Sequence, residues 1–281
     1  MNYVTTRDDT RLYVKDWGSG RPVILIHGWP LSADSWDDQA MALAQAGFRA
    51  IAYDRRGFGR SSQPWSGYDY DTLADDLADV IAATNASDAT LVGFSMGGGE
   101  VARYMSRHKG KQLAQAVLIS SIVPFLLKTP DHPAGIDQSV FDEKLAQLKA
   151  DRPHFLADFY KTFYGVGMIS QPVSNEVLEW SRSVSMQASL KATFDCSRAL
   201  ASTDFRPDLA AFEVPTLLIH GTADKNVPID ITSRVAVKAI RQAKLIEYEG
   251  AAHGVLATHK EQVIKDLLAF LTGIEFRAAT H

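Results

Sequence analysis

The segment Ala89-Thr90-Leu91-Val92-Gly93-Phe94-Ser95-Met96-Gly97-Gly98-Gly99-Glu100 decides how the rest of this sequence is interpreted. Its apolar start predicts the end of a buried strand, and residues 100–107 have a helical pattern. Ser95 therefore falls on a sharp turn between a strand and a helix, in a Gly-x-Ser-x-Gly pattern whose glycines leave room around a strained serine. This turn is typical of a nucleophilic serine, although a Gly-rich connection in any α/β protein has a similar sequence.

Strands and helices alternate on both sides of this turn, which predicts an α/β fold. Further strands are predicted at residues 22–27, 48–53, 114–120, 214–220 and 245–248, after an antiparallel hairpin at 2–6 and 11–17. Helices are predicted at about 32–46, 70–84, 229–241 and 260–271. Near-continuous apolar strands such as residues 22–27 belong in a parallel sheet that is covered on both faces.

This alternation stops between residues 122 and 211, where no strand is evident and prolines interrupt a helical pattern. We therefore predict a core of residues 1–121 and 212–281, with residues 122–211 inserted as a helical cap over the carboxyl edge of the sheet. Phe155, Phe159 and Phe163 form a helical stripe in this cap. The stripe either attaches the cap to the core or lines a pocket, and the pattern leaves both open.

Composition limits the classes of partner and compartment. The chain has 281 residues, 46% hydrophobic and 22% charged, with a net charge of -4, so no basic surface for nucleic acid or an acidic membrane is indicated. Cys196 is the only cysteine, which excludes an intramolecular disulfide. The charged N-terminal region has no apolar signal core, and no apolar run is long enough to span a bilayer. We expect a cytoplasmic protein.

A serine on such a turn needs a histidine as its base, and the histidine needs a carboxylate that fixes its tautomer. In this architecture the order along the chain is serine, acid, histidine. Asp224 lies just after the strand predicted at 214–220, and His253 follows the next strand in a loop of small residues. We predict Ser95, Asp224 and His253 as a catalytic triad. The competing carboxylates lie at the exit of the cap or at a helix start: Asp204, Asp208 and Asp230.

An acyl-transfer serine also needs N–H donors for the oxyanion. The residue after the nucleophile supplies one of them, so we predict the backbone N–H of Met96. The second donor is expected in the loop after His27, where Trp29 has a backbone N–H and Pro30 has none.

Taken together, these motifs resemble the α/β-hydrolase family. They are His27-Gly28-Trp29-Pro30, Asp54-Arg55-Arg56-Gly57-Phe58-Gly59-Arg60-Ser61, Gly93-Phe94-Ser95-Met96-Gly97-Gly98-Gly99, and the surroundings of Asp224 and His253. Within the family the sequence is similar to bacterial cofactor-free haloperoxidases, also called perhydrolases, and to aryl esterases. The resemblance covers nearly the whole chain and is weakest in the cap. It implies an eight-stranded, mostly parallel sheet with an antiparallel second strand, the triad named above, and homo-oligomers in some members.

The chemistry that follows is attack of Ser95 on the carbonyl of a small ester or carboxylic acid, then acyl transfer to water or hydrogen peroxide. A peracid formed in this way oxidises chloride or bromide off the enzyme. The sequence contains no His-Glu-x-x-His pattern, paired cysteines or haem-attachment motif, so no metal or cofactor is expected. The alternatives are an aryl esterase, lactonase or lactamase that does not use peroxide, and a non-catalytic protein that binds a small ligand.

Pro30 is expected to favour peroxide over water. Proline biases the residue before it towards an extended conformation, so the Trp29 carbonyl would be oriented to accept a hydrogen bond from hydrogen peroxide. The alternative is that Pro30 only stiffens the loop. Arg55 and Arg56 are interpreted as structural salt-bridge residues rather than an anion site. The residues expected to line the substrate pocket are Phe94, Ile122, Phe125, Phe159, Phe163, Leu200 and Val227.

Overall fold

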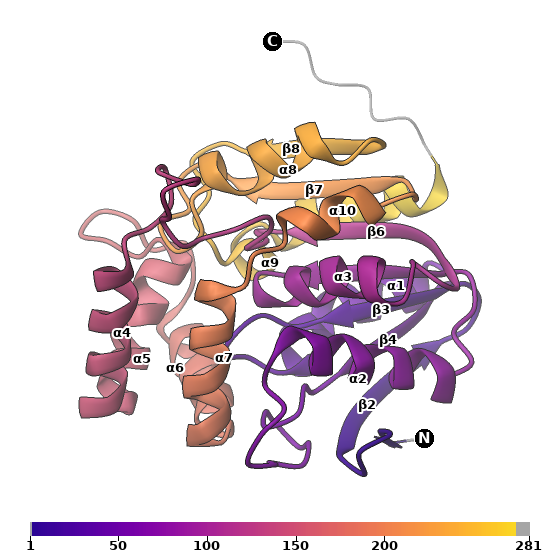
Figure 1. Ribbon diagram of the computed structural model, residues 1–281, viewed down its shortest axis with the longest axis horizontal. Coiled ribbons are helices and arrows are strands. Elements are labelled where there is room, and N and C mark those ends of the chain that lie inside the picture. The colour runs from indigo at the N-terminus through magenta and orange to yellow at the C-terminus, as the bar shows by residue number, and fades with distance from the viewer. Residues whose placement is uncertain (1, 274–281) are drawn as a thin grey trace.

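The computed structural model describes residues 2–273. Their strands form an eight-stranded sheet, with helices packed on both of its faces (Figure 1). The strand order is β1-β2-β4-β3-β5-β6-β7-β8. Strand β2 is antiparallel to both of its neighbours, whereas the neighbours from β4 to β8 are parallel. The predicted architecture, including the antiparallel second strand, is therefore confirmed. The strands are β1 (Tyr3–Thr5), β2 (Arg11–Gly18), β3 (Pro22–Ile26), β4 (Arg49–Tyr53), β5 (Ala89–Phe94), β6 (Leu113–Ile119), β7 (Thr216–Gly221) and β8 (Ala243–Tyr248).

Both faces of the central strands are buried because successive side chains point to opposite sides of the sheet. In β3, Ile24 and Ile26 join one hydrophobic cluster, and Val23 and Leu25 join the other. The first cluster is covered by α2 (Tyr70–Ala83), α3 (Met96–Arg107) and α8 (Ser233–Ala239). The second is covered by α1 (Asp37–Gln45) and α10 (Lys260–Thr272).

Helices replace strands between β6 and β7, as expected for residues 122–211. They are α4 (Gln138–Ala150), α5 (Arg152–Tyr164), α6 (Asn175–Met186) and α7 (Leu190–Ser202), and they stand together at one end of the sheet in Figure 1. Residues of α4, α5 and α7 share a cavity with Ser95, which follows the carboxyl end of β5. The helices therefore lie over the carboxyl edge of the parallel strands, while the division into a core and a cap stays a prediction.

Some helix boundaries differ from those predicted. The helix after Ser95 starts at Met96 rather than at Glu100, because the Gly-rich segment itself is helical. The helix predicted at 229–241 is divided into η3 (Ile229–Ile231) and α8, since Thr232 adopts φ -121° and ψ -98° between them. The helix predicted at 32–46 likewise begins as the short η1 (Ala33–Trp36) before α1. The remaining short elements are η2 (Arg206–Ala211) and α9 (Val255–Thr258).

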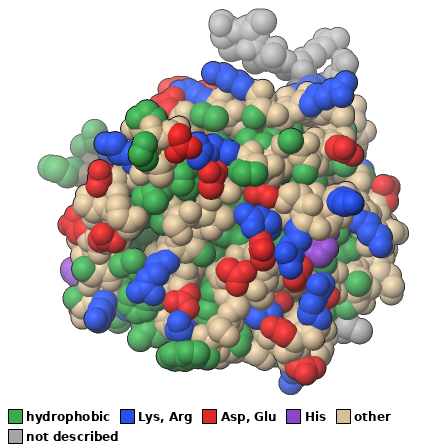
Figure 2. Space-filling model, viewed as in Figure 1, with side chains coloured by type: hydrophobic (Ala, Val, Ile, Leu, Met, Phe, Trp, Pro, Cys, Tyr) green, Lys and Arg blue, Asp and Glu red, His purple; other side chains and the backbone are tan. Residues whose placement is uncertain are grey.

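Acidic and basic side chains are interspersed over the face of the molecule seen in Figure 2. That face has no extended area of one charge sign, in agreement with the modest net charge of -4. Among residues 2–273, no helix combines the length and the apolar character needed to cross a bilayer.

Candidate active site

Ser95 sits on a strained turn between β5 and α3. Its backbone adopts φ 54° and ψ -116°, a region that costs a non-glycine residue about 1–3 kcal/mol. The turn is held by hydrogen bonds from the Ser95 N–H to Ile119 O (2.8 Å) and from the Gly98 N–H to Ser95 O (3.0 Å). A Cβ at Gly93 would lie 2.5 Å from Gly97 O, so the close crossing of strand and helix requires glycine there.

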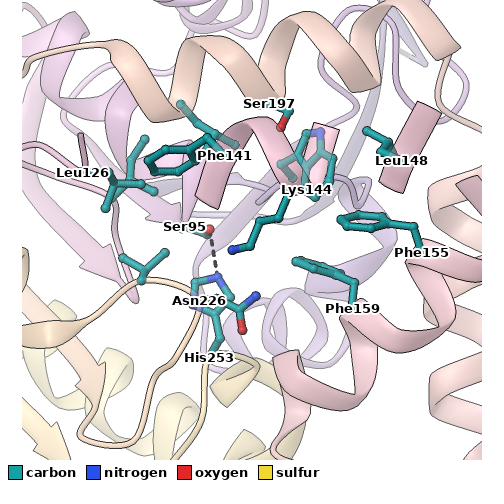
Figure 3. A pocket seen from close by; sticks show the side chains of 14 residues that line it. Ser95, Leu126, Phe141, Lys144, Leu148, Phe155, Phe159, Ser197, Asn226 and His253 are labelled. Atoms are coloured by element: carbon teal, nitrogen blue, oxygen red, sulfur yellow. Dashed lines mark hydrogen bonds between the residues drawn. The ribbon is translucent and has the colours of Figure 1, made fainter. Parts of the chain in front are cut away.

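Three residues predicted from separate parts of the chain meet at this turn. The Nε2 of His253 lies 2.9 Å from Ser95 Oγ, as Figure 3 shows, and the Nδ1 of His253 lies 2.6 Å from Asp224 Oδ2. All three are buried, and they come from the loops after β5, β7 and β8. Because Nδ1 donates its proton to the carboxylate, Nε2 is the nitrogen that can accept a proton from the serine.

The Asp224 carboxylate accepts three hydrogen bonds and lies beside a second histidine, whose Nε2 is also 2.8 Å from Val227 O. Its Oδ1 accepts the backbone N–H groups of Asn226 (2.9 Å) and Val227 (2.8 Å), while Oδ2 lies near His253 Nδ1 and 3.2 Å from His220 Nε2. Burial alone would raise the pKa of Asp224, but the charge and hydrogen bonds of His253 and His220 hold that pKa well below its usual range. The carboxylate therefore remains ionised, and His220, which the sequence presented only as a strand end, helps to position it.

Aromatic rings enclose the imidazole of His253. The ring centroid of Phe94 lies 5.2 Å from that of His253, and Phe163 approaches edge-on at 4.9 Å. Phe163 also accepts a backbone hydrogen bond from the Gly254 N–H (2.8 Å), which ties α5 to the histidine loop. These contacts restrict the imidazole to the orientation that faces Ser95.

The loop after β3, which carries Gly28 and Trp29, packs closely against Ser95. Gly28 packs so tightly that a Cβ there would lie 3.0 Å from Ser95 Cβ. The Arg55 N–H donates to His27 Nε2 (3.0 Å), so His27 Nδ1 carries the proton and donates it to Gly28 O (2.9 Å). Since the Gly28–Trp29 peptide is planar and trans, fixing that carbonyl directs the Trp29 N–H to the opposite side.

Met96 supplies a second free N–H because it is the first residue of α3. Across residues 2–273, no backbone carbonyl accepts a hydrogen bond from the N–H of Met96 or Trp29. The positive end of the α3 dipole adds to the attraction for negative charge beside Ser95. Pro30 follows Trp29 through a cis peptide bond.

Arg55 and Arg56 have the structural role expected for them. The guanidinium of Arg55 is buried against Glu100, whose other oxygen accepts from Tyr53 Oη (2.6 Å), and it also donates to His27 O (2.6 Å). Arg56 pairs with Asp76 at 2.5 Å in a separate buried ion pair. The Arg55 network anchors the start of the loop that carries Trp29.

A cavity opens above Ser95 and His253 (Figure 3). The indole of Trp29 lies on its wall, donates from Nε1 to Thr193 O of α7 (3.0 Å), and contacts Phe159 with ring centroids 5.4 Å apart. The residues that line the cavity are Trp29, Ser95, Ile122, Leu126, Phe141, Lys144, Leu148, Phe155, Phe159, Ser197, Leu200, Asn226, Val227 and His253. Most are apolar, so the cavity suits a small organic substrate.

Comparison with known proteins places this geometry in a family. Residues 21–260 match the family model of the alpha/beta hydrolase fold. The chain belongs to the α/β-hydrolase family. This α/β-hydrolase is 42% identical to a non-heme chloroperoxidase of Kitasatospora aureofaciens, over 96% of this chain and 99% of that one. It is 43% identical to a bifunctional esterase/perhydrolase of Acinetobacter calcoaceticus, again over 96% and 99% of the two chains.

A solved structure gives the same result in three dimensions. The crystal structure of bromoperoxidase from Bacillus anthracis superposes on this α/β-hydrolase with a TM-score of 0.92 and 42% sequence identity. The match covers 96% of this chain and 98% of that chain.

The cavity of this α/β-hydrolase agrees only in part with the predicted pocket. Ile122, Phe159, Leu200 and Val227 line it as expected. Three residues that were predicted to line the pocket do not line this cavity, so the prediction is wrong for them. Phe94 and Phe163 pack against the His253 ring instead, and both line a separate hollow that does not include Ser95. Phe125 packs against His132 and Arg206, away from the serine.

The other lining residues were not predicted: Leu126, Phe141, Lys144, Leu148, Phe155, Ser197 and Asn226. The i, i+3, i+7 spacing of Phe141, Lys144 and Leu148 places them on one face of α4, and this was the available signal. The aromatic stripe of α5 serves both of the functions left open. Its Phe155 and Phe159 line the cavity, while Phe163 attaches the helix to the histidine loop.

Proposed function

We propose that this α/β-hydrolase is a serine esterase and cofactor-free perhydrolase that acts through an acyl-enzyme on Ser95. The observation that carries the proposal is the hydrogen-bonded series Ser95 Oγ, His253 and Asp224 on the wall of an apolar cavity. The chloroperoxidase and esterase/perhydrolase relatives support the same reaction class. A protein that only binds a ligand has no need of a strained serine aligned with a base and an acid.

In the first half-reaction, His253 Nε2 accepts the proton of Ser95 Oγ while the oxygen attacks the carbonyl carbon of an ester. The negative charge that develops on the carbonyl oxygen is stabilised by the N–H groups of Trp29 and Met96. The bond to the leaving alcohol then breaks, and the alcohol takes the proton from His253. The product that remains is an acyl group bonded to Ser95 Oγ.

In the second half-reaction, His253 takes a proton from water or from hydrogen peroxide, whose oxygen attacks the acyl carbon. The bond between that carbon and Ser95 Oγ breaks, and the serine recovers a proton from His253. Water yields a carboxylic acid and hydrogen peroxide yields a peracid. The peracid then oxidises chloride or bromide in solution, after it has left the protein.

The cap, residues 122–211, supplies the environment for this chemistry. Its helices α4, α5 and α7 provide much of the apolar wall and separate the acyl group from bulk water. The substrates that fit this wall are small esters or carboxylic acids. Pro30 is proposed to favour hydrogen peroxide as the acyl acceptor by orienting the Trp29 carbonyl.

The test is release of 4-nitrophenol from 4-nitrophenyl acetate by the purified chain, measured together with bromination of an indicator dye in acetate and hydrogen peroxide. Both activities are expected, and both are expected to disappear when a serine-directed phosphonate modifies Ser95. A chain that releases no nitrophenol, or a phosphonate adduct located away from Ser95, would contradict the proposed function.

A further inference from the structure

Lys144 brings a positive charge into the cavity above Ser95. It lies on α4 between Phe141 and Leu148, which line the same cavity. In Figure 3 its side chain leaves the helix and its ammonium group reaches into the space between Ser95 and Asn226. A lysine on the apolar wall of a reaction cavity requires a reason, because burying an ammonium without a partner costs several kcal/mol.

No group of the described chain pairs with this ammonium. Within residues 2–273, the lysines in ion pairs are Lys15, Lys161, Lys191 and Lys260. Asp224 is close enough to favour the charged form, but its oxygens are already used by His253, His220 and two backbone N–H groups. Burial lowers the pKa of Lys144, so the fold itself gives the ammonium no stabilisation that offsets its desolvation.

Asn226 adds a second unpaired polar group to the same wall. Its Oδ1 is buried and has no hydrogen-bond partner within the described part of the chain. Buried amides are nearly always paired, so a buried amide oxygen without a protein partner on the cavity wall indicates a place for a polar ligand. Rotation of the amide by 180° exchanges its oxygen and nitrogen, so Asn226 can donate an N–H at this point.

Both residues lie between the catalytic cavity and a second hollow. Outside the catalytic cavity lies a second, larger hollow between α4 and α5. The two hollows share Lys144, Asn226, Phe155 and Phe159 in their linings. A substrate whose carbonyl lies at Ser95 would therefore extend past these four side chains. Its carbon chain would contact the phenyl rings of Phe155 and Phe159, and its far end would reach Lys144 and Asn226.

We propose that Lys144 and Asn226 bind a carboxylate at the far end of the substrate, so that the preferred substrates are esters or lactones bearing a second, ionised carboxyl group. One carboxylate oxygen accepts from Lys144 Nζ and the other accepts from the amide N–H of Asn226. The inference rests on the proposed acyl-enzyme function and adds the class of acyl donor. Half-esters of short dicarboxylic acids fit this description.

The test compares two esters that differ only at the far end: mono-4-nitrophenyl glutarate, which ends in a carboxylate, and 4-nitrophenyl pentanoate, which ends in a methyl group. The value of kcat/KM is measured for each ester with the wild type and with Lys144→Met. The ratio of the anionic to the neutral ester is expected to fall about 10-fold or more in Lys144→Met, because a charge-assisted hydrogen bond is lost. Lys144→Arg should recover most of the ratio, since it restores the charge.

Lys149→Met is the matched control because it removes the same charge from the exposed side of the same helix. It should leave the ratio of the two esters unchanged. Turnover of the neutral ester by Lys144→Met also shows that this variant has folded. An equal loss on both esters, or an unchanged ratio, would overturn the assignment of Lys144 as a carboxylate-binding residue.

A binding measurement separates this inference from the proposed function. Glutarate binding is measured by calorimetry with Ser95→Ala, and then with Ser95→Ala combined with Lys144→Met. We expect the dissociation constant to rise about 10-fold or more in the double variant. Failure of the wild type to cleave either ester would count against the acyl-enzyme, whereas equal glutarate binding by the two variants would count against the carboxylate site alone.

Discussion

The floor and the wall of the cavity are built in different ways. The floor, defined here as Ser95, His253, Asp224 and the loop that carries Trp29, is held by short hydrogen bonds and by a buried ion pair. The wall, defined as the lining residues of α4, α5 and α7, is held by packing of apolar side chains, and its Lys144 has no partner within residues 2–273. The reacting atoms are therefore fixed by the fold, whereas Lys144 on the wall is available to bind a polar group of the substrate.

The difference has a physical origin. The floor lies at the carboxyl edge of a parallel sheet, where positions such as Gly97 allow backbones to approach so closely that a Cβ would lie 2.4 Å from Ile26 O. Any larger residue there displaces the backbone. The wall consists of side chains on helices, where a substitution such as Lys144→Met is expected to change what the cavity binds and to leave the backbone in place. Under the two proposals, reaction chemistry and substrate choice are carried by separate parts of the molecule.

The largest effect is expected when a reacting group is removed from the floor of the cavity. Ser95→Ala and His253→Ala should each lower kcat for nitrophenyl acetate by roughly 10⁴-fold to 10⁶-fold. The double variant should be little worse than either single variant, because the two residues act as a unit. Steady-state kinetics of the three variants, with Ser197→Ala as the hydroxyl control on the wall, tests this. Additive losses in the double variant would contradict a shared role.

A second substitution tests how strongly the buried ion pair supports the floor. Arg55→Met leaves Glu100 without its cation and should lower the free energy of unfolding by about 3–5 kcal/mol. For a chain of this size the melting temperature should then fall by roughly 6–20 °C. Arg241→Met, at an exposed arginine, is the control and should have little effect. If thermal unfolding of Arg55→Met matches that of the wild type, the network does not anchor the loop.

The smallest expected effect concerns the choice of acyl acceptor. Pro30→Leu removes the restriction on Trp29, so the Trp29 carbonyl loses its fixed orientation beside the acyl group. One hydrogen bond to hydrogen peroxide is worth about 0.5–1.5 kcal/mol, so the ratio of peracid formation to ester hydrolysis should fall by a factor of roughly 2 to 13. Both values of kcat/KM are measured on one acyl donor. A ratio equal to that of the wild type would leave Pro30 with only a loop-stiffening role.

The floor of the cavity could be predicted from the sequence, whereas most of the wall could not. The floor follows from local patterns, because Ser95, Asp224 and His253 lie in the turns or loops after β5, β7 and β8, and these parallel strands end at one edge. The loop containing Gly28 and Trp29 is predictable for the same reason. These positions depend on strand order and turn chemistry, which the residues near each strand determine.

The wall depends on how each helix is rotated against the sheet, and a single helix does not fix that rotation. Lys144 lies in a segment rich in charged residues, where the usual expectation is a solvated face. Phe94 was expected in the pocket, but its side chain packs against the His253 ring and does not line the cavity. Asn226 follows Asp224 by two residues in a loop whose backbone also binds that carboxylate, a contact that no periodic pattern indicates.

Trp29 has a consequence for protein engineering. Its backbone N–H is the proposed second oxyanion donor, and its indole N–H donates to Thr193 O on α7 at 3.0 Å. A chimera that joins this sheet to the helical segment of a relative must place a backbone carbonyl where Thr193 O lies, or a buried donor is left unpaired at a cost of about 1–3 kcal/mol. This tryptophan therefore sets a compatibility rule for exchanging helical segments among related scaffolds, and the rule concerns the position of the α7 backbone rather than the side chain at 193.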